Sequence, residues 1–227
     1  MDTALFFKSL FEKDSNFSVL STYQNKFYSA TRFISKNGRV VNCLEANYGH
    51  WGDISDFLAQ KICQLNAIEI LHIGKVGTFR SASEVYSRIY IPKSFVVGRR
   101  SEIMSLGSKL SNSMEYMKEH SSLAHVSVTT TMEETFAQRE SFSKQKVDTI
   151  DIESSKIARA VALYNMTNKA WVKFGAIHFS SDYLKKMGES DQSIEIDLST
   201  DRENLKYRKQ NILNEIFYII KKHILEK

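Results

Sequence analysis

The stretch from Val147 to Ala160 constrains the fold of this chain more than any other. This stretch is predicted to begin as a short buried strand. The carboxylate of Glu153 follows the strand, and a run of small residues that favours a helix comes directly after it. A second apolar strand, starting at Gly175, ends in Ser-Ser-Asp at Asp182, a sequence that caps helices well. In α/β proteins, ligands bind beyond the carboxyl ends of the strands. The two junctions therefore predict one site at the carboxyl edge of a sheet.

The composition is that of an ordinary globular domain. The chain has 227 residues, of which 42% are hydrophobic and 25% are charged, and no Pro-rich or Gly-rich stretch marks a linker. We therefore predict one α/β domain over residues 1–227. The formal net charge is +5, but the Lys and Arg residues are scattered, which indicates a solvated surface rather than a nucleic-acid interface.

Other sequence features predict the cellular compartment, the state of the two cysteines and whether a metal is bound. Acidic residues interrupt the amphipathic segment 1–13 too early for a signal peptide, and no apolar run is long enough to span a bilayer. We therefore expect a cytoplasmic protein without a membrane partner. Cys43 and Cys63 lie in apolar segments, which favours buried thiols over a disulfide scaffold. Only His120 and His125 are closely spaced, so no metal site is predicted.

Turn signals and periodicity assign several further elements. Asn37-Gly38 predicts a β-hairpin over 27–43, because Asn-Gly is the strongest two-residue turn signal. The polar stretch 187–200 predicts a loop beside Asp182 that could serve as a lid. Apolar residues at helical spacing predict helices over 53–65, with an apolar stripe from Ile54 to Leu65, over 101–120 and over 201–226.

Three motifs precede the two junctions in a fixed order. Ile70 to Thr78 is predicted to be a strand followed by a Gly-x-x-Gly turn, Val85 to Val97 contains a second strand, and His125 to Thr131 is a third, with Phe136 beyond it. Together with the two junctions, these motifs resemble the nucleoside phosphorylase and nucleosidase family, which includes purine nucleoside phosphorylase and methylthioadenosine nucleosidase-like enzymes. The resemblance covers the chain from Arg39 onward and leaves 1–26 as a divergent N-terminal segment. It implies a central mixed β-sheet flanked by helices, and a homo-oligomer.

The resemblance also implies roles for residues at the two junctions. Asp182 would assist the leaving base as an acid, with Ser181 beside it among the substrate-binding residues. Glu153 would hold the ribose hydroxyls as an ionised carboxylate, and Ile152, where the family has Met, would pack beneath the sugar. Phe136 would stack on the base. The alternative roles are structural: Asp182 as a helix cap, Glu153 as a buried pairing partner and Phe136 as core.

An anion site is implied at the Gly-x-x-Gly turn. Gly74 would let backbone N–H groups approach phosphate, and Lys75 and His72 would add positive charge. Phosphate is therefore a candidate co-substrate, with water as the other nucleophile, and no cofactor is expected. His178 lies next to the acid-bearing turn, but a buried core histidine is the favoured interpretation.

The function that follows from the resemblance is cleavage of the N-glycosidic bond of a purine nucleoside or a related ribosyl compound. The alternative is a nucleoside or nucleotide sensor that keeps the pocket without catalysis. The alternative arises because no strand and glycine turn carrying an anion-binding Arg or a water-activating Glu can be recognised before Phe27. Glu45 and His50 are candidates to replace such a group.

Overall fold

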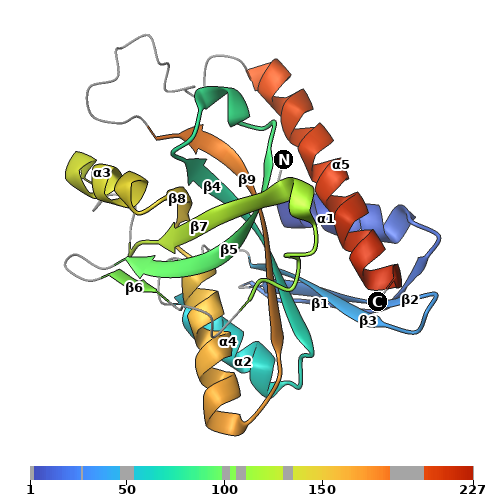
Figure 1. Cartoon of the computed structure of the whole chain (residues 1–227). Helices are drawn as coiled ribbons and strands as arrows, with labels where there is room; N and C mark the ends of the chain where they lie inside the picture. Colours follow the sequence, from blue (N-terminus) through green and yellow to red (C-terminus); the bar gives the residue numbers. More distant parts are fainter. Residues whose placement is uncertain are drawn as a thin grey trace. The chain divides into compact units, whose positions relative to one another are not determined.

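The computed structural model describes residues 3–26, 28–46, 54–98, 103–105, 111–129, 135–184 and 202–226 (Figure 1). The chain divides into two compact units, residues 1–49 with 209–227, and residues 50–208. The predicted loop 187–200, His50 and the first residue of the predicted helix 53–65 lie outside the described residues.

The first unit pairs an antiparallel three-stranded sheet with helices. Its elements are α1 (Thr3–Lys13), β1 (Phe17–Gln24), β2 (Tyr28–Ser35), β3 (Val40–Ala46) and the later part of α5 (Arg202–Glu226). Phe11 centres its core, packing on Phe17, Phe33 and Phe217. The predicted hairpin is confirmed, since Gly38 takes φ 83° at the β2–β3 turn. The predicted last helix is also confirmed, as α5.

The second unit contains a mixed six-stranded sheet with the order β6-β5-β7-β8-β4-β9. Its strands are β4 (Glu69–Thr78), β5 (Ile89–Gly98), β6 (Ile103–Ser105), β7 (Ser121–Ser127), β8 (Val147–Asp151) and β9 (Lys173–Tyr183). Its α-helices are α2 (Ile54–Gln64), α3 (Phe136–Lys144) and α4 (Ser154–Asn168), with 3-10 turns at Ala82–Glu84 and Lys118–His120. The prediction of a central mixed sheet with flanking helices is confirmed.

The sheet closes on itself. β9 pairs with β4 in parallel along its length, and residues 178 and 179 of β9 also pair with Tyr90 and Ile89 of β5. The strands β5, β7, β8, β4 and β9 therefore form a closed ring. Because side chains alternate between the two faces of a strand, every second residue of these strands can meet the others on one shared face.

The predicted helix over 101–120 is wrong in its described part. Residues 103–105 form strand β6, and Asn112 makes a bridge to Phe174. The Asn112 side chain donates to the carbonyl oxygens of Pro92 and Ala176 and accepts from the Ala176 N–H. Ser113 N–H adds a hydrogen bond to the Phe174 carbonyl. These tertiary hydrogen bonds along β9 outweigh the helical periodicity of the apolar residues.

Helix α2 forms where it was predicted, but its apolar stripe does not face the core. Ile54, Phe57 and Leu65 are exposed, at 57%, 68% and 80%. The buried residues of the helix are Ser55, Asp56, Ala59 and Cys63. Asp56 forms an ion pair with Arg159 of α4, so the α2–α4 contact uses small and polar side chains. Periodicity located the helix, while the ion pair decided which side is buried.

Candidate functional site

The junction of β8 and α4 is held by Asp151, the last residue of the strand. Its Oδ1 accepts hydrogen bonds from the N–H of Glu153 at 3.0 Å and of Ser154 at 3.1 Å. The first N–H groups of a helix lack partners within the helix, so a side-chain acceptor there favours the helix start. Ser155 N–H is satisfied in the same way by Ser127 Oγ of β7, at 2.7 Å. The helix therefore begins at a fixed place beside the strand ring.

Asp151 also organises a buried group of side chains, called here the His–Asp cluster: His72, His125, Asp151, Ser154 and His178. His125 Nε2 lies 2.9 Å from Asp151 Oδ1, and the His125 and His178 rings are 4.4 Å apart between centroids. Ser154 Oγ donates to Asp151 Oδ2 and lies 3.0 Å from His72 Nδ1 and 2.9 Å from His178 Nε2. All except His72, which is half-buried, are buried. A polar group of this density in a core is held together by its own hydrogen bonds.

Electrostatics in the cluster keep the carboxylate ionised. Burial by itself raises the pKa of Asp151, but the charge and hydrogen bond of His125 outweigh it and hold that pKa well below its usual range. Burial, with His125 nearby, holds the pKa of His178 well below its usual value, so His178 is neutral at neutral pH. Among the described residues, His178 Nδ1 has no hydrogen-bond partner. His178 is buried in the core as predicted, but the expectation that its ring nitrogens are both satisfied is wrong.

Gly74 makes room for two members of the cluster. A Cβ at this position would lie 3.0 Å from His72 Cε1 and 3.2 Å from His178 Cδ2. The predicted Gly-x-x-Gly turn is wrong, because residues 69–78 form the continuous strand β4. Lys75 is exposed on this strand. The glycine at 74 therefore serves side-chain packing, and a role for these residues with an anion stays a prediction.

Glu153 precedes α4 and is half-buried. Burial and the neighbouring charge of Asp151 raise its pKa to about 8. The sequence predicted an ionised carboxylate here, whereas this pKa keeps Glu153 mostly protonated at neutral pH. Ile152, also half-buried, packs against the core cluster that contains Phe79 and Val126. Glu153 thus lies next to a packed residue, two positions after the end of the buried strand β8.

Asp182 lies inside strand β9, which continues to Tyr183, so the predicted helix cap at Ser180–Asp182 is wrong. Asp182 is exposed, and Ser181, which is buried, donates from Oγ to Asp182 Oδ2 at 2.5 Å. The register of β4 and β9 shifts here, so that Val76 pairs with Ser180 and Gly77 pairs with Asp182. The extra residue in β9 is Ser181, as in a β-bulge, which re-aims the side chains beside it.

The two predicted junctions do not share a carboxyl edge. β8 runs antiparallel to β4, whereas β9 runs parallel to it, so β8 and β9 end in opposite directions. Both strands nevertheless flank Gly77, which pairs with Ile150 on one side and with Asp182 on the other. Adjacent strands lie about 4.8 Å apart, which places these two neighbours of Gly77 about 10 Å from each other.

Phe136 is the first residue of α3. Thr135 caps this helix, and a reciprocal hydrogen bond with Gln138 completes a capping box. The Phe136 side chain lies outside what the structure describes, so its predicted contact with the base stays a prediction.

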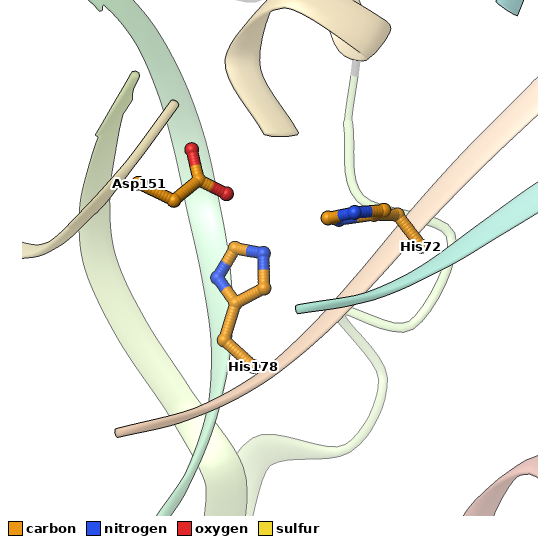
Figure 2. Close-up of side chains that lie close together, drawn as sticks. All are labelled: His72, Asp151 and His178. Atoms are coloured by element: carbon orange, nitrogen blue, oxygen red, sulfur yellow. The ribbon is translucent and has the colours of Figure 1, made fainter. Parts of the chain in front are cut away.

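Sequence reasoning missed Asp151, Ser154 and His125 as members of a site. One local signal was present, since Asp and Ser are residue types that favour the start of a helix. His72, His125 and His178 come from β4, β7 and β9, and only the order of the strands brings them together. Figure 2 shows His72 and His178 beside Asp151.

Comparison with known proteins identifies the class of fold. No family model matches the chain, and no curated protein sequence matches it. Solved structures do match over nearly the whole chain. An Arabidopsis thaliana 5'-methylthioadenosine nucleosidase in apo form superposes with a TM-score of 0.67 at 11% identity, covering 96% of this chain and 90% of that one. The chain therefore has the fold of nucleosidases and nucleoside phosphorylases.

Two further solved structures match the fold of the chain. Futalosine hydrolase of Helicobacter pylori matches with a TM-score of 0.64 at 11% identity, covering 100% of this chain and 95% of that one. Purine nucleoside phosphorylase from Toxoplasma gondii, in complex with immucillin-H, matches with a TM-score of 0.62 at 14% identity, covering 95% and 86%. The predicted resemblance to the nucleoside phosphorylase and nucleosidase family is confirmed at the level of the fold.

Of the described helices, none is long and apolar enough to cross a membrane.

Because the pKa of Glu153 is raised, we expect the free energy of unfolding of the protein to depend on pH. The folded-state pKa of about 8 lies above the ordinary value of 4.5, so the folded protein holds the proton more tightly than the unfolded chain does. The contribution of Glu153 to the free energy of unfolding is therefore complete below pH about 4.5 and is lost as the pH rises to about 8. Urea unfolding of EDTA-treated protein across this range should show the decline, and Glu153→Gln should flatten it. Parallel pH profiles for the two proteins would contradict the assignment.

Proposed function

We propose that the protein cleaves the N-glycosidic bond of a purine nucleoside or a related ribosyl compound. The observation that carries the proposal is the placement of Glu153 and Asp182 on a nucleosidase fold. The first follows β8 and the second lies in β9, on the two sides of Gly77. A separation of about 10 Å between the flanking strand positions fits a ligand that presents a sugar at one end and a base at the other.

Asp182 is proposed to act at the base. A leaving purine departs more easily if a positioned acid protonates or hydrogen-bonds a ring nitrogen. The Ser181 hydroxyl, bonded to Asp182 Oδ2, fixes the orientation of the carboxyl group. Asp182 is exposed in the free protein, so its carboxyl group is accessible to a bound base.

Glu153 is proposed to bind the ribose hydroxyls, with Ile152 beneath the sugar and Phe136 stacked on the base. A protonated Glu153 offers one O–H donor and an acceptor oxygen, so it can bind a hydroxyl in either protonation state. The opposite end of the sugar would face Lys75, Gly74 and His72. Lys75 supplies an exposed positive charge for phosphate as a co-substrate, with water as the other nucleophile and no cofactor.

The second candidate function is a non-catalytic nucleoside or nucleotide sensor on the same fold. One observation favours it: in the described part of the chain, residues 3–46 add no strand to the six-stranded sheet. An N-terminal strand and turn that would position the nucleophile is therefore not provided by these residues. Assembly as a homo-oligomer and a cytoplasmic location remain predictions.

Release of free base distinguishes the two functions. Purified protein would be incubated with a panel of purine nucleosides and methylthioadenosine, with and without phosphate. Release that requires phosphate would identify a phosphorylase, and release without phosphate would identify a hydrolase. Absence of release over the whole panel would overturn the enzymatic proposal. Saturable nucleoside binding weakened by Glu153→Ala would then support the sensor.

A further inference from the structure

Three side chains of the His–Asp cluster converge on one point. His72 on β4, Asp151 on β8 and His178 on β9 each present a donor atom, and these atoms lie within 4.8 Å of one another (Figure 2). They come from three strands, and no two are near in sequence. Their convergence is therefore a property of the closed strand ring and of no local motif.

Two imidazole nitrogens and one carboxylate oxygen form a donor set that binds divalent transition metals. Imidazole suits zinc, iron, copper and nickel, and two histidines with one carboxylate are a known ligand combination for zinc. Magnesium and calcium prefer all-oxygen sites, so this set discriminates against them. We propose that His72, Asp151 and His178 bind a divalent transition-metal ion of the zinc type.

The surroundings of the three residues are those of an ordered ligand set. Asp151 Oδ1 accepts from Ser127 Oγ and from the N–H groups of residues 153 and 154, and lies 2.9 Å from His125 Nε2. Asp151 Oδ2 accepts only from Ser154, through its N–H and its hydroxyl, among the hydrogen bonds of the described residues. Partners of this kind fix the orientation of a metal-binding carboxylate and are part of a working site. Gly74 leaves the space in which the two imidazole rings meet, since a Cβ there would lie 3.0 Å from one and 3.2 Å from the other. His72 is half-buried whereas Asp151 and His178 are buried, so His72 lies on the side of the site nearest to solvent.

Ser154 marks the centre of the site. Its hydroxyl lies 3.0 Å from His72 Nδ1 and 2.9 Å from His178 Nε2, and it also bonds to Asp151 Oδ2. One hydroxyl has a single proton, so with an ionised Asp151 both histidines have to supply the protons of their contacts. Bonds of about 2.1 Å to zinc place tetrahedral donors about 3.4 Å apart. Binding therefore requires the Ser154 hydroxyl to leave the space between the three donors. It also requires the donors to close by up to about 1.4 Å and both ring nitrogens to present lone pairs.

Zinc and cobalt binding to the full chain tests the proposal. After treatment with EDTA and removal of the chelator, we expect one zinc ion per chain by calorimetric titration and an increase in the unfolding temperature. Cobalt(II) should give the visible d–d absorption of a site with nitrogen and oxygen ligands. His72→Gln should lower the zinc affinity at least about tenfold, as loss of a ligand costs more than loss of a supporting partner, and His178→Gln should do the same.

Matched variants separate a metal site from a hydrogen-bonded cluster. Ser154→Ala should still bind zinc, because the hydroxyl is not one of the three proposed ligands. His120→Ala, a histidine outside the cluster, should bind zinc like the wild type. Because His178 is fully buried and its variant can fail to fold, His72→Gln provides the decisive comparison. Absence of saturable zinc and cobalt binding by wild type, or unchanged zinc affinity in folded His72→Gln, would overturn the proposal, whatever the outcome of the nucleoside assays.

Discussion

Asp182→Asn should lower the turnover of base release by about 10² to 10⁴-fold, which is the usual contribution of a general acid. Asn keeps the size of the side chain and can still donate a hydrogen bond, but it cannot transfer a proton to the leaving purine. Proton transfer to the base occurs only in the transition state, so KM should change much less than kcat. Steady-state rates of base release with the best substrate of the panel would measure both.

Two controls test whether a loss of turnover in Asp182→Asn comes from the missing acid. Glu119→Gln removes an exposed carboxylate outside the proposed site and should leave kcat unchanged. Unfolding curves of Asp182→Asn should match those of the wild type, since an exposed strand residue carries little of the stability. Full turnover by Asp182→Asn would remove Asp182 from the role of the acid, even if the protein is a nucleosidase.

The Asp151→Ala variant should lose about 3–5 kcal/mol of its free energy of unfolding, the range found when one partner of a buried ionic group is removed. The substitution leaves His125 Nε2, Ser127 Oγ and two N–H groups of the α4 start without their acceptor. Global stabilities of domains are commonly about 5–15 kcal/mol, so this loss is a large part of the total. Urea unfolding of metal-free protein would measure it.

Asp148→Ala is the matched control for this prediction. Asp148 is equally buried on the same strand, at 8% exposure. Its carboxylate accepts one backbone N–H, from Leu123 at 2.6 Å, and lies 3.9 Å from Nη1 of the exposed Arg80 side chain. Loss of a hydrogen bond to a charged group costs about 1.5–3 kcal/mol. If the two variants lost equal free energy, the His–Asp cluster would contribute no more than the one hydrogen bond and the one ion pair of Asp148, and our account of Asp151 would be wrong.

The sequence predicted those features that depend on neighbours along the chain. The Asn37-Gly38 hairpin, the final helix and the strand that leads into α4 all carry local signals, and all are present. The helix over 101–120 was wrong because the contacts of Asn112 with β5 and β9 outweigh local periodicity. The order of motifs along the chain, read as a resemblance, was sufficient to indicate the fold.

The site could be predicted only in part, because it depends on which strands are neighbours. Alternation along a strand places His178 or Asp151 on one of two faces, but the partners on that face come from β4 and β7. The role of Gly74 was missed for the same reason. From sequence, a glycine in Gly-x-x-Gly indicates a turn, whereas in the fold Gly74 leaves space for two histidines from different strands. The direction of β8, antiparallel to β4, likewise separated two junctions that local sequence placed at one edge.

The closed ring has a consequence for behaviour at high concentration. Strand β9 would be an open edge if it paired with β4 alone, and an open edge can recruit a strand from another molecule. Here Tyr86 N–H, Ser113 N–H and the Asn112 side chain satisfy carbonyl and N–H groups of β9 on either side of its short pairing with β5. Within the described part of this sheet, the outermost strand opposite is β6, which has only 3 residues. The six-stranded sheet thereby offers little template for edge-to-edge aggregation.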